Sequence, residues 1–183
     1  MELSNNQLEV VKLVRGFFPT TSYLGGSTAL ELYFDQSFKA ADLDFFIYQP
    51  RSMERWALEI LLHRAFDVLM KGWEYTGVYK IEGQYAYFKC RHLGIEFDLI
   101  FIDPERIEDP CKTVGSSLAT VQLKIDYSPS GINTKSIPPC YRSIFKFMKG
   151  SNAIQVFDGN TPIQLEKVKR RAAQLGYKIH QEY

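Results

Sequence analysis

Apolar side chains repeat at helical spacing in two parts of the chain. In residues 5–15 the aliphatic side chains fall on one side, which predicts a short amphipathic helix. Residues 53–71 carry the clearest helical pattern, and Gly72 follows them as a typical helix stop. The apolar stripe predicted for this second helix consists of Trp56, Ile60, Leu61, Phe66, Leu69 and Met70.

Strand-forming residues occupy the segments between and after these helices. Residues 22–24 form a brief extended stretch, and residues 42–48 alternate acidic with apolar side chains. Residues 75–81 and 85–93 have the pattern of a hairpin, and residues 95–102 end with apolar side chains on both faces, as in a central strand. This order of elements predicts an α/β (α+β) fold, with a mixed β-sheet flanked by helices.

The rest of the chain has weaker patterns and ends in one more predicted helix. That helix has Pro162 in its first turn, runs to about residue 175, and is followed by Gly176. No internal repeat, low-complexity tract or linker divides the 183 residues. We therefore expect a single domain over residues 1–183.

The composition agrees with a packed domain and excludes several classes of protein. Hydrophobic residues make up 45% of the chain and aromatic residues 14%, which is enough for a core. The 22 Lys and Arg residues nearly balance the 21 Asp and Glu residues, whereas avid sequence-independent duplex binding usually needs a basic excess.

The cysteine spacing and the apolar runs bear on the compartment. Cys90, Cys111 and Cys140 lack the paired spacing of a disulfide framework or a structural zinc site. No signal-peptide pattern occurs, and no apolar run approaches the roughly 18 residues that span a bilayer. We expect a cytoplasmic protein with no membrane partner.

Three acidic residues interrupt the apolar strand patterns. Asp42 and Asp44 lie two positions apart on one predicted strand, so both carboxylates face the same side. Carboxylates that converge repel one another unless a cation lies between them, and Mg²⁺ prefers carboxylate oxygen. Asp98 is a third acid within an apolar strand, where an unpaired buried charge is costly. Glu96 faces the same side as Asp98 and is the alternative third carboxylate.

Gly25, Gly26 and Ser27 join a short predicted strand to a predicted helix. Unpaired backbone N–H groups at a helix start can bind a phosphate, and glycine lets a ligand approach the backbone closely. Ser27 is also placed to cap the helix. The segment therefore predicts a phosphate-binding turn.

In this order, the three segments resemble the polymerase-β nucleotidyltransferase superfamily. The matching strings are LGGSTALELYF at residues 24–34, DLDFFI at 42–47 and EFDLIFI at 96–102. The resemblance is closest to small stand-alone members, such as AbiEii-type and minimal nucleotidyltransferases. It implies a single nucleotidyltransferase-like domain with core motifs over about residues 20–105 and a C-terminal extension over about 106–183.

The resemblance also implies a role for each matching position. Residues 25–27 (Gly-Gly-Ser) would hold the phosphates of an NTP such as ATP. Asp42 and Asp44 would bind Mg²⁺ (or Mn²⁺), and Asp98 would complete a second metal site and help to deprotonate the attacking hydroxyl. The implied reaction is a two-metal, in-line transfer of NMP to an RNA 3′ end, a protein hydroxyl or a small molecule.

This sequence departs from the family pattern in two places. The spacer between Ser27 and Asp42 is slightly longer than usual, and Ala41 stands where many members have a polar residue. The alternative function is a catalytically inactive module of the same fold that binds a nucleotide or a protein partner, as in toxin–antitoxin or phage-defence systems. The acceptor, the preferred base and the oligomeric state stay open.

Basic side chains gather on the last predicted helix. One interpretation is a solvated helix face near a C-terminus, and the other is a clamp for a triphosphate or an RNA acceptor. The candidate phosphate or acceptor contacts are Lys167, Lys169, Arg170 and Arg171.

Overall fold

The structure is a computed structural model. It describes residues 3–19, 22–34, 42–48, 54–78, 84–102, 122–128, 131–137, 145–156 and 162–181. The helices are α1 (Asn5–Phe17), α2 (Gly26–Phe34), α3 (Arg55–Leu69) and α5 (Pro162–Leu175), with a short 3-10 turn η2 (Lys149–Ser151). The strands are β1 (Ser22–Gly25), β2 (Asp42–Tyr48), β3 (Glu74–Val78), β4 (Gln84–His92), β5 (Ile95–Ile102), β6 (Gln122–Ser128), β7 (Gly131–Ile137), β8 (Phe145–Met148), β9 (Ala153–Val156) and β10 (Lys178–Gln181).

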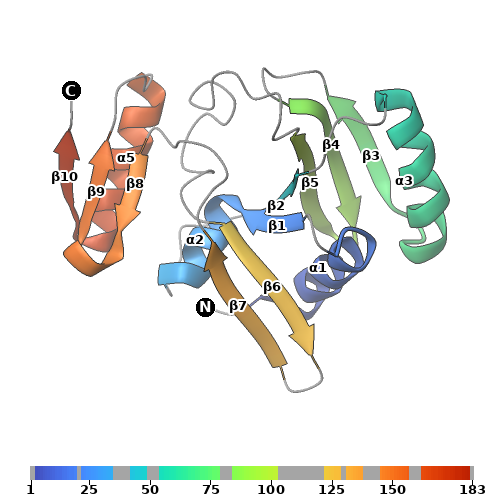
Figure 1. The fold of residues 1–183 in the computed structure, drawn as a ribbon, viewed down its shortest axis with the longest axis horizontal. Coiled ribbons are helices and arrows are strands. Elements are labelled where there is room, and N and C mark those ends of the chain that lie inside the picture. Colours follow the sequence, from blue (N-terminus) through green and yellow to red (C-terminus); the bar gives the residue numbers. More distant parts are fainter. Residues whose placement is uncertain are drawn as a thin grey trace.

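The main sheet is mixed, as the sequence predicts. Within the described residues its strand order is β3-β4-β5-β2-β1-β6-β7. The two central strands β2 and β5 run parallel, and their neighbours pair with them antiparallel. The β6–β7 hairpin joins β1 through the pair Leu24 and Leu123 and extends away from the helices (Figure 1). The protein is therefore a mixed α+β structure with helices against its sheet.

A second, smaller sheet has the order β10-β9-β8 within the described residues, with α5 beside it (Figure 1). Strands β9 and β10 are parallel because α5 crosses between them. Ile154, Val156 and Val168 from this part belong to the same buried cluster as the main sheet. The division into one domain stays a prediction, since residues 103–121 lie outside the described part.

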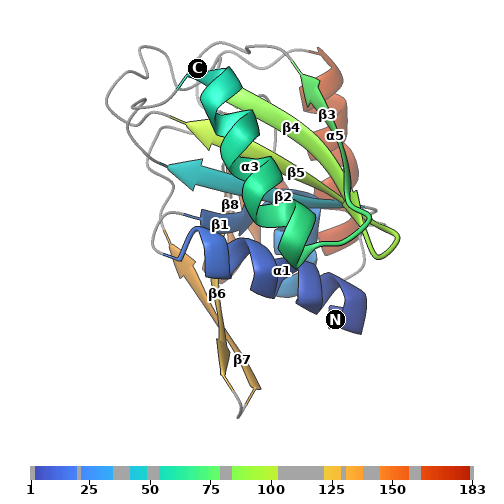
Figure 2. The same cartoon turned by 90° about the vertical axis from the view of Figure 1, so that its right-hand side faces the viewer.

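Helices α1 and α3 cover one face of the main sheet, and α5 lies beyond the opposite face (Figure 2). The covered face is built from alternate strand residues, since successive side chains of a strand point to opposite faces. These side chains are at most 1% exposed: Leu43, Phe45, Ile47, Phe97, Leu99 and Phe101. The apolar face is therefore the core of the fold.

The buried side of α3 differs from the predicted stripe. Phe66 and Met70 are buried as predicted, but Trp56, Ile60 and Leu69 are 67%, 48% and 51% exposed. The side chains that meet the sheet recur every four residues: Leu58, Leu62, Phe66 and Met70. Leu61 is partly buried against the core, so the prediction was wrong at three of its six positions, because α3 is apolar around much of its circumference. Periodicity alone then cannot tell which side faces the sheet.

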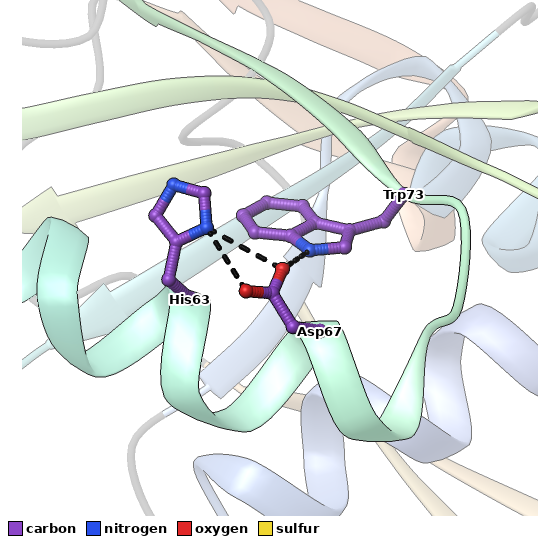
Figure 3. Close-up of polar contacts among 3 residues, drawn as sticks. All are labelled: His63, Asp67 and Trp73. Atoms are coloured by element: carbon purple, nitrogen blue, oxygen red, sulfur yellow. Dashed lines mark hydrogen bonds and ion pairs between the residues drawn. The ribbon is translucent and has the colours of Figure 1, made fainter.

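A polar contact ties the end of α3 to the chain that leads into β3. The indole N–H of Trp73 donates to Oδ1 of Asp67 over 2.7 Å, and Nδ1 of His63 lies 3.3 Å from Oδ2 (Figure 3). The ring of Trp73 stacks on Tyr75, with centroids 5.1 Å apart. This cluster holds the α3–β3 turn in place.

None of the described helices is long and apolar enough to cross a membrane.

Candidate active site

The parallel pairing of β2 with β5 brings the three predicted acids together. The register places Asp44 beside Asp98 and Asp42 beside Glu96, so all four side chains share one face. One carboxylate oxygen from each of Asp42, Asp44 and Asp98 lies within 4.8 Å of the other two. The face that carries them is the one opposite α1 and α3.

Glu96 faces the same side but has a different partner. Its Oε1 accepts a hydrogen bond from Nη2 of Arg91 over 2.6 Å, and both side chains are 58% exposed. The bond to Glu96 raises the pKa of the Arg91 guanidinium. The structure therefore places Asp98, and not Glu96, with Asp42 and Asp44.

Asp98 is the most buried member of the cluster, with 8% of its surface exposed. Burial raises the pKa of its carboxyl, while the hydrogen bond from Tyr87 and the charge of Lys89 act in the opposite direction. The charge of Asp42 adds to the upward shift. Two further acids at such short range make the cluster a site of concentrated negative charge, which a cation would relieve.

The chemistry of the donor set fits a hard divalent cation. All three side chains offer carboxylate oxygen, the ligand that Mg²⁺ and Mn²⁺ prefer. Cys90 lies nearby on β4, but it alternates to the apolar face and is 5% exposed. Burial raises the pKa of its thiol, which disfavours the thiolate that binds metals.

The Gly-Gly-Ser turn lies next to the acids. Gly25 pairs with Asp44 in the β1–β2 register, and Gly26 has a left-handed φ of 67° that turns the strand directly into α2. The hydroxyl of Thr28 donates to the backbone carbonyl of Asp42 over 2.7 Å, which ties this helix start to β2. The Gly-Gly-Ser turn and the carboxylates therefore share one end of the strands.

The predicted capping role of Ser27 is corrected by the structure. The helix α2 begins at Gly26, so Ser27 lies inside the first turn and not before it. The glycine makes this possible because its positive φ carries the chain into the helix one residue earlier. The Ser27 hydroxyl instead accepts a hydrogen bond from Nη2 of Arg171 over 2.9 Å.

Arg171 reaches the turn from α5, at a distance of 144 residues along the chain. It is only 8% exposed, and burial lowers the pKa of its guanidinium. Lys169 and Arg170, on the same helix, are exposed. The side chain of Lys167 lies outside the described part. Among the described side chains of the four predicted basic residues, Arg171 is the one that meets the Gly-Gly-Ser turn.

A cavity of about 410 Å³ opens on the other side of the acids, over β3, β4 and β5. Asp42 and Asp98 form part of its wall, together with Thr76 and Lys89. In the sheet register, Thr76 lies beside Lys89 and Lys89 beside Asp98, so these side chains share the polar face. The strand order places the cavity on the β3 side of the cluster and the Gly-Gly-Ser turn on the β1 side.

Sequence reasoning missed the contribution of β4. The hydroxyl of Tyr87 donates to Oδ2 of Asp98 over 2.7 Å, and Lys89 is the direct cross-strand neighbour of Asp98. The period of two along residues 85–93 could have placed Tyr87 and Lys89 on one face. It could not have shown which strand lies beside them, because that pairing is set by the tertiary fold.

Comparisons with known proteins return nothing: no family model, no curated protein and no solved structure matches this chain. The function therefore has to be argued from the chemistry of the site.

Proposed function

We propose that this protein is a nucleotidyltransferase of the polymerase-β type that moves NMP from an NTP to a hydroxyl acceptor. The observation that carries the proposal is the convergence of Asp42, Asp44 and Asp98 within 4.8 Å, beside the Gly-Gly-Ser turn. The sequence resemblance of residues 24–34, 42–47 and 96–102 points in the same direction.

The three carboxylates would hold Mg²⁺ or Mn²⁺. When bound, such a cation neutralises the triphosphate and makes the acceptor hydroxyl easier to deprotonate. The protein contributes the fixed spacing of the carboxylates, which Asp44 and Asp98 owe to adjacent positions on parallel strands. The three carboxylates repel one another, and a bound cation would relieve this repulsion more fully than water does.

The donor nucleotide would bind on the β1 side of the cluster. Backbone N–H groups at the start of α2 and the hydroxyl of Ser27 are suited to the β- and γ-phosphates. Arg171 already donates to Ser27, and a guanidinium can bind a phosphate through two parallel hydrogen bonds. Lys167, Lys169 and Arg170 remain candidates for looser contacts with the triphosphate or with an RNA acceptor.

The acceptor would bind in the 410 Å³ cavity on the β3 side. Asp98 belongs to both the cluster and the cavity wall, so it is placed to accept the proton of an acceptor hydroxyl. The new bond joins the acceptor oxygen to the α-phosphorus, and the bond to pyrophosphate breaks. In-line displacement needs the attacking and leaving oxygens on opposite sides of phosphorus, which suits a cavity and a phosphate-binding turn on opposite sides of the acids.

The experiment that tests the proposal compares the wild-type protein with the double variant Asp42→Asn, Asp44→Asn. Each is incubated with NTPs labelled at the α-phosphate, Mg²⁺ or Mn²⁺, and mixed cellular RNA and protein. We expect label transfer from the wild type and none from the variant. The variant should fold with equal or greater stability without divalent cations, because it loses carboxylate repulsion.

Either of two outcomes would redirect the proposal. Full transfer by the double variant would show that these acids are not the metal site. No transfer by the wild type, together with thermal stabilisation by NTP and Mg²⁺, would favour the alternative of an inactive module that binds a nucleotide or a protein partner.

A further inference from the structure

The hydroxyl of Tyr87 makes a direct contact with the third carboxylate. Tyr87 lies on β4, on the same face as Lys89, and β4 pairs with β5 beside Asp98. Its hydroxyl donates to Oδ2 of Asp98 over 2.7 Å, a distance within the range of a hydrogen bond to a charged acceptor. The side chain is partly buried, and a phenol hydroxyl is a hydrogen-bond donor at neutral pH.

This contact constrains an otherwise adjustable group. A carboxylate turns about two side-chain bonds, and its preferred orientation near Asp42 and Asp44 would be away from their charge. The phenol ring of Tyr87 has few rotamers, and its hydroxyl satisfies one oxygen of Asp98. The carboxyl also interacts directly with Asp44, and one oxygen from each lies within 4.8 Å of one from Asp42. Outer partners of this kind orient the ligands in metal sites and tune their affinity.

We propose that Tyr87 is a positioning residue, whose hydroxyl holds Oδ2 of Asp98 so that the carboxylate binds the divalent cation together with Asp42 and Asp44. The inference rests on the proposed function of the acids as a metal site. Tyr87 acts through Asp98, the carboxylate to which its hydroxyl donates. Lys89 differs in kind: it is exposed and neutralises charge, but an ammonium on a flexible stem fixes no orientation.

The test measures Mn²⁺ binding to the full chain by calorimetry or by electron paramagnetic resonance. Tyr87→Phe removes the hydroxyl and keeps the ring, so we expect Mn²⁺ affinity to fall by about 10-fold. Tyr23→Phe is the matched control, since the ring of Tyr23 lies tilted against that of Tyr48, on a neighbouring strand of the same sheet, with centroids 5.8 Å apart. It should bind Mn²⁺ as the wild type does. Circular dichroism verifies that both variants fold.

A double-mutant cycle decides whether Tyr87 acts through Asp98. In an Asp98→Asn background, Tyr87→Phe should cause no further loss of Mn²⁺ affinity, because the carboxylate that it positions is gone. In the transfer reaction, Tyr87→Phe should raise the Mg²⁺ concentration needed for half-maximal rate and leave the KM for NTP at saturating Mg²⁺ unchanged.

The outcomes separate this inference from the proposed function. Equal Mn²⁺ affinity of Tyr87→Phe and wild type would overturn the inference and leave the metal site standing, and so would an equal loss in both backgrounds of the cycle. If the wild type binds no Mn²⁺, or if Asp42→Asn with Asp44→Asn binds it equally well, the metal site fails and this inference falls with it.

Discussion

The two faces of the main sheet are made by the same strands but differ in chemistry over the first half of β2 and β5, where one face is apolar and the other carries acids. On β2, Leu43, Phe45 and Ile47 are buried beneath α1 and α3, while Asp42 and Asp44 point to the other side. Strand β5 repeats the arrangement beside it, since Phe97 and Leu99 flank Asp98. The residues of the candidate site are therefore interleaved, one by one, with those of the core.

This interleaving separates two kinds of effect that substitutions can have. The apolar face contributes the burial that stabilises the fold, and the acids on the other face contribute mutual repulsion that opposes folding. Changes on the two faces of one strand should therefore affect different measurements. Four tests follow, in order of decreasing effect; the first two compare the two faces of β5 directly, and the other two examine contacts outside them.

The largest effect is expected for Asp98→Asn, which should lower nucleotide transfer by more than about 100-fold. A direct ligand should matter more than an outer partner, whose loss typically costs roughly 10- to 100-fold. Glu96→Gln is the matched control two residues away on the same face. Its exposed pair with Arg91 is worth about 0–1 kcal/mol, so transfer and stability should change little. A reversed order in a transfer assay would make Glu96 the third ligand.

Phe97→Ala lies on the opposite face and should act on stability. Phe97 is fully buried and its ring centroid is 6.2 Å from that of Phe45, so the truncation should cost about 3–5 kcal/mol. Urea unfolding measures this cost. Val68→Ala on α3 is the control, because Val68 is 70% exposed and should change stability by no more than about 0.5 kcal/mol. Comparable costs for the two would mean that this face is not the core.

Arg171→Met tests the link between α5 and the Gly-Gly-Ser turn. A hydrogen bond from a charged donor is worth about 1.5–3 kcal/mol, so NTP affinity should fall by roughly 10- to 100-fold. Arg170→Met, its exposed neighbour, should lower it far less. Equilibrium binding of a labelled NTP in Mg²⁺ measures both. Equal losses would indicate that the helix acts only through its overall charge.

The smallest effect concerns the polar cluster at the end of α3. The hydrogen bond from Trp73 lowers the pKa of Asp67 below its ordinary value of 3.8. The hydrogen bond and charge of His63 lower it further. A lowered pKa means that the stabilisation is present above pH 3.8 and is lost as the pH falls through the lowered pKa. Trp73 fluorescence in a Trp56→Phe background should therefore change at acid pH.

Asp67→Asn is the control for that titration. It keeps a side-chain oxygen near the indole but has no carboxyl to titrate, so the acid transition in Trp73 fluorescence should disappear. A transition of the same midpoint and size in this variant would assign the signal to another group. Nucleotide transfer should be unaffected, since Asp67 is not part of the cluster of carboxylates.

Local patterns were enough to predict much of the fold and part of the site. The period of two in 42–48 placed Asp42 and Asp44 on one side, and Pro162 and Gly176 marked the ends of the last helix, as the structure has them. The buried side of α3 was predicted correctly only in part. Its sequence offers apolar residues on several sides, and only the sheet against which it packs selects Leu58 and Leu62.

By itself the sequence determined which residue types alternate on each strand, because that alternation depends only on local backbone geometry. Tertiary structure alone decided that β2 lies parallel to β5 with Asp44 beside Asp98, and that Tyr87 meets Asp98 from β4. It also brought Arg171 to Ser27 across 144 residues. These contacts join distant segments whose pairing is set by the burial of the whole apolar face, which no local window of sequence contains.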